Sequence, residues 1–181
     1  THVLAEKIRL LAENREECAR LRFDAIGRGG LRDDDHPFEE IAELASMSME
    51  LFSMEHWDVF FKDQTELHRA QLEEMERIIS VLPWIATIDK FQHWLYTNPG
   101  HSVQQREEQW LAILDEFATG ITDWSGFDEY RRNLWQKQLH LFEVPFYYIE
   151  YGIAQLGAIA MWRQYRGNKP NGCHGKQAGA E

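Results

Sequence analysis

Apolar side chains recur along this chain at the three- and four-residue spacing of a helix face. One such stripe consists of Leu67, Leu72, Met75, Ile79 and Leu82. This spacing is typical of amphipathic helices, and no run alternates with the two-residue period of a strand. The pattern therefore predicts an all-α fold, a multi-helix bundle of about six or seven helices.

Glycine, proline and polar segments divide the pattern into separate helices. Residues 27–37 interrupt a first helix, and a second helix follows from about Phe38 to Trp57. Pro83 has no N–H to donate, so we expect it to end a third helix and residues 84–96 to form a fourth.

The second half of the chain carries further boundary signals. Ser102 and Gln105 fit a capping box at the start of a helix that turns Trp110 inward. Pro145 is expected in the first turn of the last helix. A backbone N–H has no partner within the helix at that position, so proline loses no hydrogen bond there. That helix should end at about Arg166.

These boundaries predict three segments. We expect a divergent N-terminal helix and loop at residues 1–35, a helical domain at 36–166, and a tail without fixed structure at 167–181. The tail has no apolar period from which a packed core could form. With 181 residues, 44% of them hydrophobic, the chain suits one domain with a sizeable core.

Charge and cysteine content narrow the function classes. The net charge of −11 repels phosphate backbones, so we expect no nucleic-acid partner. No apolar run reaches the ~20 residues of a membrane span, and the opening residues lack the layout of a signal peptide. The two cysteines, Cys18 and Cys173, are expected as free thiols in the cytoplasm, with one disulfide as the alternative.

Two regions carry polar groups where a core helix would carry apolar ones. Glu43 and Glu50 are seven residues apart on the second helix and share a face beside apolar neighbours. Buried carboxylates need a cation or a donor, so this face could hold a metal. The alternative is a solvated helix edge, which spacing alone favours.

The last helix opens with three tyrosines, and a histidine precedes it. Tyr148 and Tyr151 are three residues apart and share a face, with Tyr147 and His140 nearby in the sequence. Hydroxyls and an imidazole at a helix N-terminus can stabilise an oxyanion. Tyrosine rings packed in the core are the alternative, and spacing alone favours it.

A third pair, Asp89 and His93, is four residues apart and could face one cation. Di-metal bundles instead require two Glu-x-x-His repeats, and the chain contains none. A surface aspartate and a packed histidine are therefore the better interpretation.

Four stretches in order resemble the oligoendopeptidase F and thimet-oligopeptidase family of zinc metallopeptidases, with the oligoendopeptidase F branch closest. They are E-I-A-E-L-A-S-M-S-M-E-L, F-Q-H-W-L-Y-T-N-P-G-H, I-T-D-W-S-G and H-L-F-E-V-P-F-Y-Y-I-E-Y-G-I-A-Q-L-G-A. The resemblance covers residues 36–166. It implies a metallopeptidase-like helical domain, zinc as the family's metal, and hydrolysis of internal bonds in short peptides.

The resemblance also assigns roles. In the family's E-x-x-S-x-x-x-E motif the first glutamate is the third zinc ligand, which corresponds here to Glu43. Glu50 and Ser46 would support Glu43 without binding the metal themselves.

The family's closing segment supplies one histidine and two tyrosines that contact substrate and stabilise the tetrahedral intermediate. His140, Tyr148 and Tyr151 match this catalytic set, and Tyr147 replaces Tyr148 if the register differs by one residue.

The chain departs from the family in one decisive respect, because it contains no H-E-x-x-H. Two zinc-binding histidines and the general base are therefore missing, and catalytic zinc needs about three protein ligands. We expect a C-terminal fragment of the peptidase, inactive alone and without bound zinc, that forms a homo-oligomer through exposed apolar surface. The alternative is a non-catalytic pseudoenzyme, a helical module that binds peptides or a partner.

Overall fold

The structure is a computed structural model and describes residues 36–168. Its elements in order are α3 (His36–Ser53), η1 (Met54–Val59), α4 (Gln64–Thr97), α5 (Val103–Phe117), α6 (Asp128–Asn133), η2 (Leu134–Lys137), α7 (His140–Glu143) and α8 (Tyr148–Gly167). The all-α prediction is confirmed, since none of these residues forms a strand. The predicted first helix, both cysteines and the segment 169–181 lie outside the described residues.

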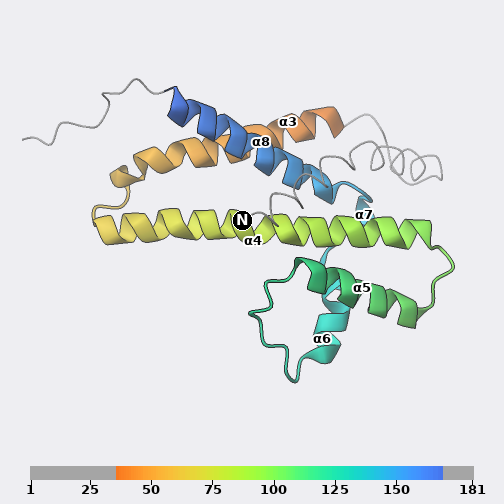
Figure 1. Ribbon diagram of the computed structural model, residues 1–181. Helices are drawn as coiled ribbons and strands as arrows, with labels where there is room; N and C mark the ends of the chain where they lie inside the picture. Colours follow the sequence, from red (N-terminus) through yellow and green to blue (C-terminus); the bar gives the residue numbers. More distant parts are fainter. Residues whose placement is uncertain (1–35, 169–181) are drawn as a thin grey trace, which may run out of the picture.

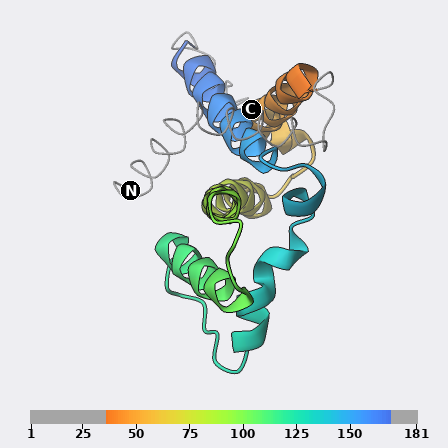
Figure 2. The same cartoon turned by 90° about the vertical axis from the view of Figure 1, so that its right-hand side faces the viewer.

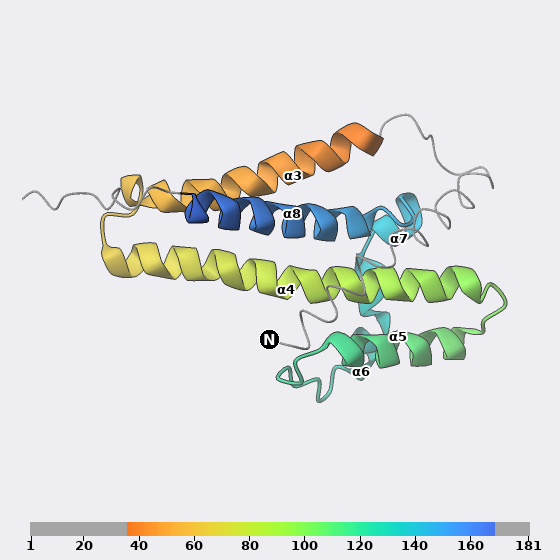
Figure 3. The same cartoon turned by 45° about the horizontal axis from the view of Figure 1, so that its top comes forward.

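Helix α4 runs through the middle of the molecule and separates two groups of helices (Figure 1). Viewed along α4, helices α3 and α8 lie on one side, and α5 and α6 lie on the other (Figure 2). Helices α3 and α8 begin at the same end of the molecule and run side by side (Figure 3). No helix within residues 36–168 combines the length and the apolar character needed to cross a bilayer.

Two glycines let α8 approach both of its neighbours closely. A Cβ at Gly157 would lie 2.8 Å from Leu44 Cδ1 on α3, and one at Gly152 would lie 3.2 Å from Ile85 Cγ2 on α4. One turn beyond Leu44, the buried Ser48 hydroxyl donates to the Leu44 carbonyl at 2.6 Å. Small side chains on α8 therefore fix how the three helices pack.

The prediction that Pro83 ends a helix is wrong, because Pro83 lies inside α4, which is 34 residues long. An interior proline costs about 3 kcal/mol. Leu82 and Ile85, which flank Pro83, are only 5% and 1% exposed, so burial on both sides of the proline offsets that cost. The Thr87 hydroxyl also donates to the Pro83 carbonyl at 2.8 Å.

An aromatic core joins α4 to α5. Trp110 is fully buried, its ring centroid lies 5.1 Å from that of Phe91, and its indole N–H donates to the Arg131 carbonyl at 2.9 Å. The capping box predicted at Ser102 and Gln105 is confirmed. It starts α5 in the register that turns Trp110 inward.

The prediction that Pro145 lies in the first turn of the last helix is wrong, because α8 starts at Tyr148. Phe146 intervenes with a φ of 61°, a left-handed conformation that is unusual for a bulky residue. Its ring is 1% exposed, and its backbone N–H donates to Gln92 Oε1 at 2.9 Å. These contacts hold the turn that separates α7 from α8.

Candidate functional site

His140 and the three tyrosines of the last helix form one cluster. The His140 ring centroid lies 4.8 Å from that of Tyr148, 5.6 Å from Tyr151 and 6.4 Å from Tyr147. Tyr147 is buried, whereas Tyr148 and Tyr151 are half-buried. The turn at Phe146 makes this possible, because it folds α7 back beside the first turn of α8. The structure thus brings together all the residues of the predicted catalytic set and its alternative, Tyr147.

Two further residues support His140. Gln138 Nε2 lies 2.7 Å from His140 Nδ1, and Gln138 Oε1 accepts a hydrogen bond of 3.0 Å from the indole N–H of Trp84. Trp84 belongs to the middle of α4, so this chain of contacts anchors His140 to the central helix.

The environment of the cluster shifts two pKa values. Burial lowers the pKa of His140, against the opposing effect of the Glu143 carboxylate. Burial raises the pKa of Tyr148, and proximity to Tyr151 raises it further, while the indole N–H of Trp84 acts in the opposite direction. Near neutral pH the cluster therefore presents an uncharged His140 imidazole beside the protonated phenol of Tyr148. Such neutral donors suit an oxygen on which negative charge develops.

Glu43 lies in the first half of α3, and the cluster lies at the start of α8, which begins at the same end of the molecule as α3 (Figure 3). Glu43 is half-buried and precedes Leu44, which lies against Gly157. Tyr151 comes six residues before Gly157 (157 − 151 = 6), which corresponds to about 9 Å along the helix. No hydrogen bond among the described residues joins Glu43 to the cluster.

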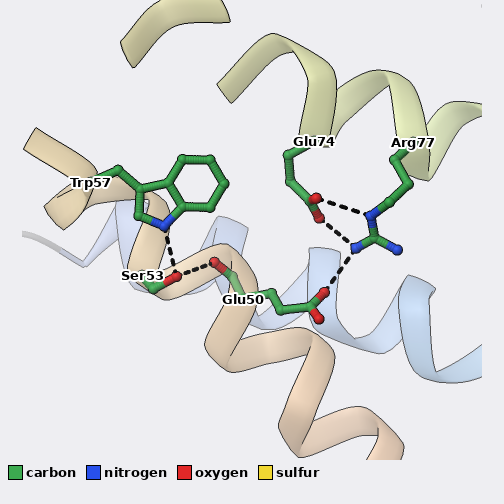
Figure 4. Close-up of polar contacts among 5 residues, drawn as sticks. All are labelled: Glu50, Ser53, Trp57, Glu74 and Arg77. Atoms are coloured by element: carbon green, nitrogen blue, oxygen red, sulfur yellow. Dashed lines mark hydrogen bonds and ion pairs between the residues drawn. The ribbon is translucent and has the colours of Figure 1, made fainter. Parts of the chain in front are cut away.

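Glu50 faces α4 instead and is held by an ion pair. Arg77 Nη2 lies 2.8 Å from Glu50 Oε2 and 2.6 Å from Glu74 Oε1. Ser53 Oγ donates to the Glu50 carbonyl at 2.8 Å and accepts from the Trp57 indole at 3.1 Å, so that five residues are joined (Figure 4). The Glu50 side chain is 49% exposed, and these contacts tie the end of α3 to α4. Ser46 is exposed.

The described residues do not by themselves fit a zinc ion. Nowhere between residues 41 and 168 do three or more His, Cys, Asp or Glu side chains gather in a group that could hold a metal. The Asp89–His93 pair lies 3.6 Å apart. Asp89 is only 3% exposed, so the expectation of a surface aspartate is wrong; the helix that continues past Pro83 carries it into the core.

Sequence reasoning missed Trp84 and Gln138. Gln138 lies two residues before His140, which was the one local signal available. Trp84 lies 54 residues before Gln138, and no motif connects them in the sequence.

Comparison with known families shows a match over most of the chain. The sequence model described as Peptidase family M3 matches residues 35–181 of this chain. No curated protein and no solved structure matches it significantly.

Proposed function

Because the chain belongs to peptidase family M3, we propose that it is the C-terminal portion of a zinc metalloendopeptidase of the oligoendopeptidase F type. The reaction would be hydrolysis of internal bonds in short peptides. Family members use zinc and bind peptide substrates. The observation that carries the proposal is the cluster of His140 with Tyr148 and Tyr151, whose rings lie within 6 Å of one another.

In this proposal the chain supplies two parts of the active site. Glu43 is the third zinc ligand, and His140, Tyr148 and Tyr151 face the carbonyl oxygen of the substrate. Leu44, next to Glu43, packs against Gly157, about 9 Å along α8 from Tyr151. This spacing is consistent with these roles, because a peptide carbonyl must fit between metal and donors. Glu50 supports the helix of Glu43 through its ion pair with Arg77.

A cytoplasmic location is part of the proposal. Two cysteines in 181 residues do not make a disulfide framework, and free thiols are typical of reducing compartments. Reaction of the unfolded protein with a thiol reagent should count two free thiols if this is correct.

We expect the purified chain to contain no stoichiometric zinc. Glu43 is one ligand, and catalytic zinc sites use three protein ligands. Elemental analysis after exposure to excess zinc and gel filtration should give far less than one zinc per chain. A full equivalent of zinc that Glu43→Ala removes would contradict this expectation.

The decisive experiment joins the chain to the missing motif. The coding sequence upstream is expected to contain H-E-x-x-H, and the longer product should cleave a quenched fluorescent peptide, with cleavage stopped by chelation. Replacing the glutamate of that motif with glutamine is the control for zinc-dependent hydrolysis. If no such motif is encoded and the chain binds peptides without cleaving them, the pseudoenzyme alternative holds.

We further expect the chain to self-associate. Several large apolar side chains are mostly exposed among the described residues, including Phe60 at 79%, Val59 at 63% and Ile41 at 65%. Exposed apolar surface favours association, whereas the net charge of −11 opposes it at low salt. Sedimentation at micromolar concentration should show a dimer or larger species, increasing with salt. A monomer at both low and high salt would refute the prediction.

A further inference from the structure

The starting observation is the hydrogen bond between Trp84 and Gln138. An indole N–H can only donate, so the group that faces it must be the carbonyl oxygen of the Gln138 amide. The bond is 3.0 Å long. The indole is fixed by its edge-to-face contact with Trp110, with ring centroids 6.0 Å apart, and by Lys137 Nζ, 4.3 Å from its centroid. Trp84 therefore determines which way the Gln138 amide points.

The orientation of that amide determines where His140 carries its proton. With its oxygen turned to Trp84, Gln138 presents its NH₂ group to His140 Nδ1 at 2.7 Å. An amide NH₂ only donates, so Nδ1 must offer a lone pair. The neutral ring then carries its proton on Nε2, and a protonated ring would place two donors against each other.

We infer that Trp84 and Gln138 are positioning residues that hold His140 as a neutral imidazole with its proton on Nε2. Within residues 36–168 no hydrogen bond uses Nε2 of His140, so the ring offers an Nε2–H donor beside the tyrosine hydroxyls. Such a donor suits the carbonyl oxygen of a peptide as it becomes an oxyanion. This use of the donor rests on the proposed function, whereas the protonation state of His140 does not.

The surrounding charged groups do not account for this state. Glu143, on the same helix as His140, favours a charged ring. Tyr147, Tyr148 and Tyr151 face the ring from α8. The neutral state therefore depends on burial and on the amide of Gln138.

The inference is tested by nitrogen NMR of the histidine-labelled chain. Eight histidines are present, so the His140 signals are identified by their loss in His140→Gln. Long-range proton–nitrogen correlations distinguish the two neutral forms and the charged form, and a pH titration gives the pKa. In the unmodified chain we expect the Nε2–H form alone at neutral pH.

Two variants make the test sharp. In Gln138→Glu a carboxylate faces Nδ1 and accepts its proton, so the pKa of His140 should rise by about 1 to 3. In Trp84→Phe the amide is free to turn its oxygen toward Nδ1–H, so the pKa should rise by a smaller amount. This second effect is the more telling one, because it passes through Gln138.

Gln136→Glu is the matched control. Gln136 is exposed and bonds to Asn133, so the variant adds the same charge two residues away without facing His140. An equal rise in Gln136→Glu and Gln138→Glu would overturn the inference, as would an Nδ1–H form in the unmodified chain. Circular dichroism checks that each variant is folded. Because NMR reads the protonation state directly, absence of peptidase activity in the longer product that contains H-E-x-x-H would reject the proposed function and leave this inference standing.

Discussion

Replacing Glu43 with alanine, in a longer protein that contains the H-E-x-x-H helix, is expected to remove zinc and lower kcat/KM by more than about 100-fold. Loss of a residue that only supports a metal ligand typically costs about 10- to 100-fold, and loss of a ligand should cost more. With Glu43 gone, two protein ligands remain where catalytic zinc needs three. Elemental analysis and cleavage of a quenched fluorescent peptide provide the two measurements.

Glu50→Ala is the matched control, since Glu50 is an acidic residue seven positions further along α3 whose side chain pairs with α4. It pairs with Arg77 at the surface, and such pairs contribute about 1 kcal/mol or less. Zinc content and kcat/KM should therefore fall far less than in Glu43→Ala. Equal losses in both variants would mean that Glu43 is not a ligand.

Trp110→Ala should lower the free energy of unfolding of the present chain by about 3–5 kcal/mol. Trp110 is 0% exposed, and its ring packs against Phe91 and Trp84. Its removal leaves a cavity between α4 and α5 and takes away one of two donors to the Arg131 carbonyl, which keeps the backbone N–H of Leu134. Because native domains are stable by only about 5–15 kcal/mol, a large fraction of the total would be lost. Urea unfolding followed by circular dichroism measures the change.

Two further variants separate the causes. Trp110→Phe keeps a six-membered aromatic ring but loses part of the indole and its hydrogen bond to Arg131, so the expected cost is about 1–3 kcal/mol. Ile121→Ala changes a side chain that is 86% exposed, and its effect should stay within about 0.5 kcal/mol. A cost for Trp110→Ala no larger than that for Ile121→Ala would show that this aromatic core contributes little to stability.

Rules based on neighbouring residues predicted the features that depend on contacts between residues close together in the sequence. The helical period of apolar residues determined the all-α fold, because each helix must bury one face. The capping box could be predicted at Ser102 because its partner, Gln105, is three residues away. Motif order along the chain pointed to the family that the M3 match shows. It also singled out His140, Tyr148 and Tyr151, which the structure brings into one cluster.

Local rules failed where distant residues decided the outcome. The rule that proline ends a helix predicted a boundary at Pro83. In the structure Gly152 of α8 packs against Ile85, and burial on both sides of the proline keeps α4 continuous. A helix-start rule placed Pro145 in α8, yet Gln92 on α4 and the core hold Phe146 in a left-handed turn.

The sequence by itself determined the helical class, the family and the candidate residues, because these depend on periodicity and motif. The tertiary structure alone decided how His140 is held. Trp84 and Gln138 are 54 residues apart, and they meet only because α4 runs unbroken beneath the segment that precedes α7. The amide orientation set by that contact determines which nitrogen of His140 carries the proton, a property that no spacing in the sequence encodes.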